Sequence, residues 1–371
     1  MQFTVNRDLL LKSLNFVQGV VEKKNTLPIL SNVMINAKNN SLELVATDLD
    51  IVFYDKISKV NISQEGNTTT SANVLFDILR KIPSNSEINF NLKSENKLSL
   101  KTQNSDFNLL CLPSSNFPTF DDNFQSEVIE IEKKNFLSLL NKTKISISND
   151  DTRHYLNGVY LHGTQSNKNS FLTGVATDSH RLSSSSIIVK DIENFPSIIL
   201  PRKTVFLLST LLSDLEDKVR IQTSENKVKL SIGKINLISK VIDGKFPDYQ
   251  KVVPKENTQT LVVESGDFIN SVERVASVSL DRKEGVKLEL SKDKLKLSVN
   301  STNSGDGNEV VSAKYNGENI TIGFNSKYLI DIASEVEDKN LVFNLKDSTS
   351  PVLVLDNSDK NSFYVIMPMK I

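Results

Sequence analysis

The chain has 371 residues, a formal net charge of -1 and ordinary proportions of apolar and charged residues. Its length exceeds what one hydrophobic core usually supports, so we expect two or three domains and favour three of roughly 120 residues. The near-zero charge excludes a whole-molecule attraction to nucleic acid or membrane, so any polyanion site must be a local patch.

Residue usage narrows the class further. The single cysteine, Cys111, excludes an internal disulfide framework, and three histidines are too few for a zinc site of the usual Cys/His kind. The first residues lack the pattern of a signal peptide, and no run approaches the roughly 18 apolar residues of a membrane helix. Phosphate-loop, GxSxG, HExxH and EF-hand spacings are also missing. We therefore expect a soluble cytoplasmic protein with no cofactor and no metal.

The first 125 residues predict a helix followed by strands, twice over. Leu10, Leu14, Val17 and Val21 fall on one face of a helix that runs from about Arg7 to Val21. Alternating apolar residues at 42–46 and the apolar run at 51–53 predict strands after it. A second apolar stripe at 75–82 predicts another helix, which Pro83 ends, and strands are expected at 88–92, 98–100 and 107–109.

The same order recurs in two further copies. Apolar stripes at 136–147 and 205–215 predict the helices of the second copy, and stripes at 268–279 and 329–336 those of the third. The copies end alike, at Phe117-Pro118, Phe246-Pro247 and Met367-Pro368. We predict an α+β fold of three similar domains, 1–125, 126–256 and 257–371, each built from two modules of a helix and an antiparallel sheet.

The segment at 177–182 also permits a catalytic interpretation. Asp178 and His180 are common general acid and base groups. A hydrolase would further need a nucleophile or metal and an oxyanion site, and no nucleophile elbow surrounds the nearby serines. The corresponding Thr47-Asp48 has no histidine after it. We therefore favour a role for Asp178 in hydrogen bonding the backbone where a strand ends, and keep a hydrolase that uses Asp178 and His180 as the alternative.

Short segments at matching spacings carry a resemblance to a known family. They are FTVNRDLL (3–10), TLPIL (26–30), TDLD (47–50), YLNGV (155–159), VATDSHRLS (175–183), PRK (201–203), DGKFPDY (243–249), IGFNSKYL (322–329) and YVIMPMKI (364–371). Over essentially its full length, the chain resembles the bacterial sliding clamp, the β subunit of DNA polymerase III. The resemblance implies a head-to-tail homodimer, a six-domain ring that encircles double-stranded DNA without sequence preference. Such a ring tethers polymerases and has no reaction of its own.

The resemblance implies DNA contacts mainly in the first two domains, at Lys24, Arg80, Arg153, His154, Arg202 and Lys203. Lys24 stands where the family commonly has arginine, which keeps the charge but loses the bidentate fork. From charge alone, the lysines at 133, 134, 142 and 144 make the helix that begins at Lys133 a candidate for phosphate contacts, with a solvated face as the alternative. The helices of the third domain are more acidic, so we expect fewer contacts there.

The resemblance also implies a hydrophobic groove between the second and third domains. It receives short linear motifs of the polymerase III catalytic subunit, the clamp loader, other polymerases and repair proteins. The carried-over residues are Tyr155, Leu156, Thr177, Ser179, His180, Arg181, Leu182, Pro247, Val252, Asn325, Tyr328, Val365, Ile366, Met367, Pro368 and Met369. Methionine suits such a role because its unbranched thioether can repack. Ser179 replaces a glycine often found there, and Lys251 replaces an arginine. The alternative is that Leu156, Leu182, Val365 and Ile366 are simply core residues.

A dimer interface is the third implied site. It would join the first domain of one copy to the third domain of the other. The expected apolar residues are Ile78, Ile82, Phe107 and Leu109 on one side and Val278 on the other. Lys97 and Lys101 would face an acidic loop around Asp306 and Glu309.

Overall fold

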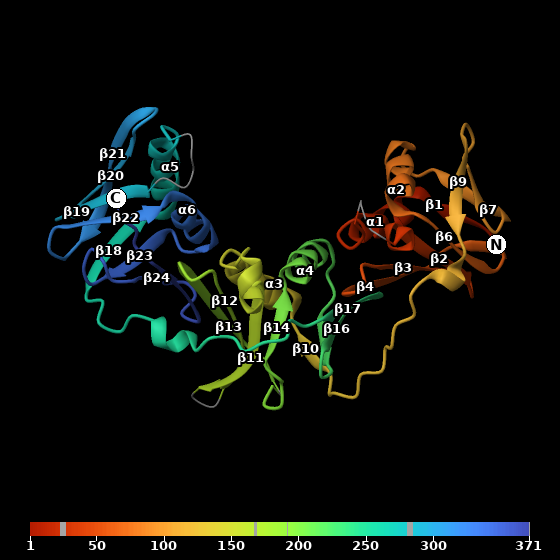
Figure 1. The fold of residues 1–371 in the computed structure, drawn as a ribbon, viewed down its shortest axis with the longest axis horizontal. Coiled ribbons are helices and arrows are strands. Elements are labelled where there is room, and N and C mark those ends of the chain that lie inside the picture. The colour runs from red at the N-terminus through yellow and green to blue at the C-terminus, as the bar shows by residue number, and fades with distance from the viewer. Residues whose placement is uncertain (23–26, 167–168, 191, 280–284, 371) are drawn as a thin grey trace. The chain divides into compact units, whose positions relative to one another are not determined.

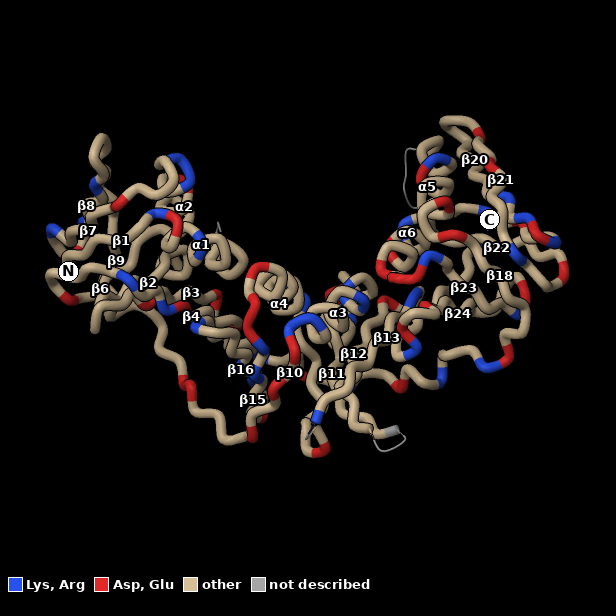
Figure 2. The backbone as a smooth tube through the Cα atoms, turned by 180° about the vertical axis from the view of Figure 1, so that it is seen from behind, with Lys and Arg blue, Asp and Glu red and all other residues tan. Residues whose placement is uncertain are grey.

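The computed structural model describes residues 1–22, 27–166, 169–190, 192–279 and 285–370. The chain forms two compact units (Figure 1). The first unit consists of Met1–Leu137 and Lys203–Val241, and the second of Ser138–Arg202 and Ile242–Ile371. Acidic and basic residues are interspersed along the backbone of both units (Figure 2), in agreement with the near-neutral net charge. In the described part of the chain, no helix is long and apolar enough to cross a membrane.

The first unit begins with the first copy of the repeat. Its helices are α1 (Arg7–Val17) and α2 (Ala72–Lys81), and a short η1 (Pro28–Ser31) and η2 (Ser114–Asn116) are 3-10 turns. Its strands are β1 (Gln2–Asn6), β2 (Asn32–Lys38), β3 (Ser41–Thr47), β4 (Ile51–Ile57), β5 (Asn61–Gln64), β6 (Gly66–Ser71), β7 (Glu87–Ser94), β8 (Lys97–Lys101) and β9 (Asp106–Leu112). The helix and strand pattern predicted for this copy is confirmed.

Helix α1 is shorter than the sequence predicts. Asn6 caps its start, accepting a hydrogen bond from the amide of Asp8 at 2.9 Å, and the helix ends at Val17 instead of Val21. Val20 and Val21 are still buried, but they lie in a turn that follows Gly19. Glycine and β-branched valine are weak helix formers, so the apolar stripe continues where the helix does not.

The rest of the first unit comes from the second copy. It contains β10 (Ile129–Ile131), helix α4 (Arg202–Asp214) from its second residue onward, β15 (Val219–Thr223), β16 (Lys227–Ile232) and β17 (Ile235–Lys240). Among the described residues, a 13-stranded sheet joins the two copies in the order β10-β15-β16-β17-β4-β3-β2-β6-β9-β8-β7-β1-β5. The connection between copies is the antiparallel pair β17 and β4, in which Leu237 lies opposite Phe53.

The second unit has the same construction. It contains most of α3 (Lys133–Lys144), then η3 (Asp151–Leu156), β11 (Gly158–Ser166), β12 (Asn169–Thr177), β13 (Arg181–Ile188), β14 (Ile198–Pro201) and η4 (Tyr249–Val252). The third copy adds β18 (Gln259–Glu264), α5 (Ser265–Ala276), β19 (Gly285–Ser291), β20 (Lys294–Ser301), β21 (Gly305–Tyr315), β22 (Ile320–Asn325), α6 (Ser326–Glu335), β23 (Asn340–Leu345), β24 (Val352–Asp356) and β25 (Ser362–Ile366). Helices α5 and α6 lie side by side (Figure 1).

A 12-stranded sheet joins the described parts of these copies in the order β14-β11-β12-β13-β25-β24-β23-β18-β21-β20-β19-β22. Here β13 pairs with β25, and Leu182 lies opposite Val365. The two connections between copies are therefore equivalent: the fourth strand of one copy's first half pairs with the fourth and last strand of the next copy's second half. The chain is three domains of helices and antiparallel sheets, as predicted. The boundaries at 125 and 256 stay predictions, since the compact units divide within the second copy.

Candidate functional site

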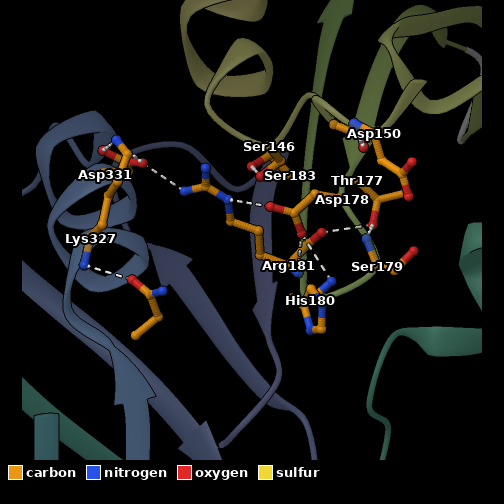
Figure 3. Close-up of polar contacts among 12 residues, drawn as sticks. Ser146, Asp150, Thr177, Asp178, Ser179, His180, Arg181, Ser183, Lys327 and Asp331 are labelled. Carbon is orange, nitrogen blue, oxygen red and sulfur yellow. Dashed lines mark hydrogen bonds and ion pairs between the residues drawn. The ribbon is translucent and has the colours of Figure 1, made fainter. Parts of the chain in front are cut away.

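The turn that joins β12 to β13 is built by Thr177 and Asp178. The Thr177 hydroxyl donates to the carbonyl of Arg181 at 2.7 Å, and Asp178 Oδ1 accepts from the amides of His180 and Arg181, both at 2.9 Å (Figure 3). The turn between β3 and β4 repeats this arrangement, with Asp48 Oδ1 accepting from the Ile51 amide at 2.7 Å. The predicted role of Asp178 as an acceptor for backbone amides is confirmed.

Arg181 is a structural residue of this turn. Its Nε lies 3.1 Å from Asp178 Oδ2, its Nη1 lies 2.7 Å from Asp331 Oδ2 on α6, and its guanidinium lies 4.2 Å from the centre of the Tyr328 ring. The side chain is 7% exposed. Arg181 therefore ties the turn to α6, with its charge paired inside the fold, and its place in the groove stays a prediction. Burial, followed by the charge of Asp178, raises the pKa of Tyr328.

The geometry does not form a catalytic pair from Asp178 and His180. Asp178 bonds the backbone of His180, and its second oxygen faces Arg181. In the described part of the chain, no hydrogen bond or ion pair involves the His180 ring, which is exposed, while the His180 carbonyl accepts from the Met367 amide at 2.8 Å. The segment is a turn that anchors the C-terminal tail.

An apolar cluster lies beneath this turn. Leu156, Leu182 and Val365 are each 3% exposed, and they pack with other buried residues and with the half-buried Tyr155. Ile366 points to the opposite face of β25, into the core of the third domain, and is fully buried. Ile366 is thus a core residue, as in the alternative interpretation, because successive strand residues face opposite sides.

Exposed apolar side chains follow members of this cluster in the sequence. Val252 on η4 is 52% exposed, and Met367 and Met369 are 41% and 38% exposed. The tail is held in place because the Met369 amide donates to the carbonyl of Gly323 at 2.9 Å. Pro247 is exposed and Pro368 is half-buried. Lys251 forms an exposed ion pair with Asp248, at a distance of 3.2 Å.

The remaining groove candidate on α6 serves the fold. Asn325 caps α6, its Oδ1 accepting from the amide of Lys327 at 3.0 Å.

Gly158, in the YLNGV segment, allows two backbones to approach closely: a Cβ at this position would collide with the carbonyl oxygen of Leu200. Glycine is therefore required where β11 leaves η3 and passes β14.

In the first unit, the DNA-contact candidates differ in availability. Lys24 lies outside the described residues. Arg80 is exposed at the end of α2, 3.2 Å from Asp77. The Lys203 ammonium lies 2.6 Å from Asp48 Oδ2 and donates to the Val20 carbonyl at 2.7 Å, so its charge is used within the fold. Lys203 is thus less available for phosphate than the resemblance implies.

The second unit holds the other candidates. Arg153 donates from Nε to Asp150 at 2.9 Å and from Nη1 to the Ser179 hydroxyl at 2.6 Å. His154 is exposed, its ring edge-on to Tyr155. The amide of Arg202 donates to the carbonyl of Asn157 at 2.9 Å.

The basic helix α3 is less available than its charge indicates. Lys142 is 3% exposed, and its ammonium lies 2.8 Å from Asp359 and 3.2 Å from Glu337. Burial alone would lower the pKa of Lys142, but the hydrogen bond and charge of Asp359, with Glu337, raise it overall. Lys142 is therefore a buried ion-pair partner, and its expected contact with phosphate is wrong. Lys133, 3.0 Å from Glu216, is also paired.

The expected interface residues are partly brought together. Ile78, Ile82 and Phe107 line one hollow of about 1270 Å³ beside β9. Leu109 does not line it; this residue is buried and lies opposite Leu98 in its own sheet. Val278 is half-buried after α5, where a Cβ added to Gly307 would meet it.

Two of the charges expected to meet across that interface, Lys101 and Glu309, are paired inside the chain. Glu309 lies 2.9 Å from Nε of Arg274 and 2.8 Å from the Ser271 hydroxyl. The Arg274 hydrogen bonds hold the pKa of Glu309 down at about 2. Lys101 lies 2.9 Å from Asp106 on the neighbouring strand. The expected pairing of Lys101 with Glu309 of another copy would have to break both pairs.

Sequence reasoning missed two links around the turn. One joins Arg181 to Asp331, 150 positions apart, and the other joins Arg153 to Ser179. A signal for the second was present: Ser179 stands where glycine is often found, and its φ is +76°, in the left-handed region that favours glycine. The turn geometry explains why glycine is often found at this position, but the hydrogen bond from Arg153 needs a side-chain acceptor, which glycine lacks.

Comparison with known proteins agrees with this architecture. Three models of the DNA polymerase III beta subunit match the chain: the N-terminal domain at residues 1–121, the central domain at 130–248 and the C-terminal domain at 250–370. The beta sliding clamps of Caulobacter vibrioides and Escherichia coli are 35% and 34% identical to it, each over 100% of both chains. A crystal structure of the Bartonella birtlesii sliding clamp bound to griselimycin is 40% identical, with a TM-score of 0.95 and full coverage of both chains.

Three domains of this fold, joined through shared sheets, define a DNA-clamp protein, and the matches extend over the whole chain. The chain belongs to the DNA polymerase III beta subunit family, the beta sliding clamps. It is a non-catalytic processivity factor of DNA replication, so the hydrolase alternative is set aside.

Proposed function

We propose that two copies of this chain close head to tail into a ring around double-stranded DNA. The observation that carries the proposal is the repeated connection between copies of the domain. Strand β4 pairs with β17, and β13 pairs with β25. Each pair joins the fourth strand of one copy's first half to the fourth strand of the next copy's second half. The next pair in this series is β21 of the third domain with β9 of the first domain in another copy.

Both of these strands have an edge available for pairing. In the described part of the chain, residues 106–110 of β9 pair with β8 on one side and with no strand on the other. Residues 305–312 of β21 likewise pair with β20 alone. An exposed edge is a template for another strand, and two heterologous contacts of this kind close a dimer. The hollow lined by Ile78, Ile82 and Phe107 lies beside β9, where the partner's residues near Val278 would pack.

DNA would be held by topology, with weak contacts to phosphate. Arg80, Arg153, His154 and Arg202 are the proposed contacts, and Lys24 joins them by resemblance. Lys203 contributes less, because Asp48 already pairs with it, and the buried Lys142 is left out of the contacts. Contacts of this type attract without reading sequence. A bacterial replication clamp acts at the chromosome, so we propose the cytoplasm as its place of action.

The partner site is proposed around the cluster of Leu156, Leu182 and Val365. The exposed Val252, Met367 and Met369 would cover apolar anchors of a bound peptide, as flexible thioethers adapt to different side chains. Partners would be the polymerase III catalytic subunit, the clamp loader, and other polymerases and repair proteins that carry short linear motifs.

Topological retention gives the test. The full-length protein is loaded by a clamp loader onto closed circular DNA, and retention is measured as salt rises. Simple phosphate binders lose affinity steeply with salt. A closed ring stays on circular DNA and leaves after a restriction enzyme linearises it. Equal and fast loss from circular and linear DNA at moderate salt would contradict the ring.

A further inference from the structure

Ser179 has a backbone conformation that its side chain disfavours. Its φ is +76°, and Leu49, in the equivalent turn of the first domain, has a φ of +80°. In both turns a threonine hydroxyl accepts from the residue at this position, Ser179 at 3.1 Å and Leu49 at 2.9 Å. The turn therefore imposes the conformation, and glycine would satisfy it with less strain than serine.

The serine hydroxyl has a specific partner. Nη1 of Arg153 donates to Ser179 Oγ at 2.6 Å, and Nε of Arg153 donates to Asp150 Oδ2 at 2.9 Å. Asp150 also accepts from the amide and hydroxyl of Thr152, at 3.0 and 2.6 Å, and these bonds, followed by that of Arg153, lower the pKa of Asp150. Two of the three guanidinium nitrogens are thus engaged.

The third nitrogen, Nη2, has no hydrogen-bond partner among residues 1–22, 27–166, 169–190, 192–279 and 285–370. The Arg153 side chain is 37% exposed, so Nη2 can reach a ligand. A guanidinium fixed at two nitrogens presents its remaining donor in one direction, with less entropy to lose than a free side chain.

Apolar residues stand close to Arg153 in the sequence and on the facing turn. Tyr155 and Leu156 follow Arg153 on η3, and Leu182 follows Ser179 across the turn, and these three residues belong to or pack on one cluster. A ligand that reaches Nη2 while resting on this cluster needs an apolar anchor and an anionic group. A peptide with leucine-like side chains and one carboxylate has both.

We propose that Ser179 is a positioning residue that orients Arg153 to receive a carboxylate of the bound peptide. The inference rests on the proposed peptide function and adds a specificity to it: an acidic residue is preferred over its neutral amide at one position. Ser179 sets this preference through Arg153 without touching the peptide. The chain retains a strained serine at this turn because glycine would remove the hydroxyl that holds the guanidinium.

The test uses the full-length protein and short synthetic leucine-containing peptides, labelled for fluorescence anisotropy. In the peptide series, glutamate is placed at each position in turn, and each peptide is paired with a control that has glutamine at the same position. We expect one position where the wild type prefers glutamate about five- to tenfold, as for a charge-assisted hydrogen bond. Ser179→Ala and Ser179→Gly should both reduce that preference to within about twofold. Ser179→Asn should keep it, because asparagine tolerates this φ and its carbonyl can accept from Nη1.

A matched control separates the hydrogen bond from backbone strain. Leu49→Gly relieves the same strain in a turn that has no arginine partner, so it should raise Tm and leave the peptide preference unchanged. Ser179→Gly should also raise Tm, whereas Ser179→Ala should not. Loss of the preference in both Ser179 variants, despite their different effects on Tm, would identify the hydroxyl as the cause.

Four results would overturn the inference in distinguishable ways. The role of Ser179 would be rejected, with the peptide site intact, by either of two results. The wild type could bind leucine peptides without preferring glutamate at any position, or Ser179→Ala could keep the preference. A wild type that binds none of the peptides rejects the proposed peptide function itself. Weaker retention on circular DNA in Ser179→Ala, with unchanged peptide preference, would assign Arg153 to phosphate instead.

Discussion

The role of a charged residue in this chain depends on its partners in the fold. Lys142 and Lys133 both belong to the same basic helix in the sequence, yet Lys142 is buried against Asp359 and Glu337 and Lys133 pairs at the surface. Charge patterning predicts where cations occur but not which carboxylates from distant strands meet them. Asp359 lies 217 positions from Lys142, a separation that no local pattern encodes.

Removing one partner of the buried pair should destabilise the protein. Asp359→Asn leaves the Lys142 ammonium with a weaker partner in a site that is 4% exposed, and we expect a loss of about 3 kcal/mol in the free energy of unfolding. Glu216→Gln, which breaks the surface pair with Lys133, should cost about 0.5 kcal/mol or less. Urea denaturation at pH 7 measures both, and equal losses would contradict the buried role of Lys142.

The same pair predicts a dependence of stability on pH. Burial alone would raise the pKa of Asp359, but the Lys142 hydrogen bond and Ser362 lower it overall from an ordinary 3.8. A depressed carboxyl pKa stabilises the fold above that ordinary value, and the contribution disappears as pH falls through the lower folded pKa. The raised pKa of Lys142 gives stability that is complete below about 10.5 and is lost above it. In Asp359→Asn the free energy of unfolding should therefore fall less steeply than in the wild type as the pH drops below about 4. Denaturation curves measured at each pH give this slope.

At the scale of elements, periodicity predicted the helices and strands well and their ends less well. The α2 stripe ends at Pro83 as expected, because proline removes a donor and blocks the helix, whereas α1 ends before its stripe does. The carried-over groove residues also divide by the face of the strand. Val365 joins the apolar cluster and Ile366 joins the third-domain core, an alternation that follows once β25 is known to be a strand.

The C-terminal tail should contribute to peptide binding without supporting the fold. Met367→Ala removes an exposed thioether next to the cluster, and we expect the affinity for partner peptides to fall about tenfold, or about 1.4 kcal/mol. Ile188→Ala, at the other end of β13, removes a side chain that is 59% exposed and should leave the affinity unchanged. Isothermal titration calorimetry gives both values, and an unaltered affinity in Met367→Ala would locate the peptide site elsewhere.

For the whole molecule, the repeat was readable from sequence because three copies share their order of elements and their Phe-Pro or Met-Pro ends. The sequence did not predict which strands of neighbouring copies pair with each other. Pairing of β17 with β4 and of β25 with β13 joins strands far apart in sequence, and it makes compact units that divide the second copy. Apolar alternation predicts that a strand exists, but the identity of its neighbour depends on the folded edge.

The proposed dimer should depend on β9 and its hollow. Phe107→Glu places a charge beside Ile78 and Ile82, and we expect the dimer to dissociate at least about tenfold more readily, because an unpaired carboxylate would be buried. Ile188→Glu adds the same charge at a side chain that is 59% exposed on β13, outside both proposed edges, and it should have a much smaller effect. Analytical ultracentrifugation over a range of concentrations separates the two, and identical dissociation constants would place the interface away from the hollow.

The sharing of sheets between copies has a consequence for how this protein can be divided. A second domain excised at its boundaries would lose β4 and β25, and with them the partners of β17 and β13. Each excised piece would then present a bare strand edge whose amides and carbonyls are free to recruit any other chain, the property that leads small sheet proteins to aggregate. A duplicated module is therefore less prone to aggregate than an excised one, because every added copy covers a strand edge of the copy before it.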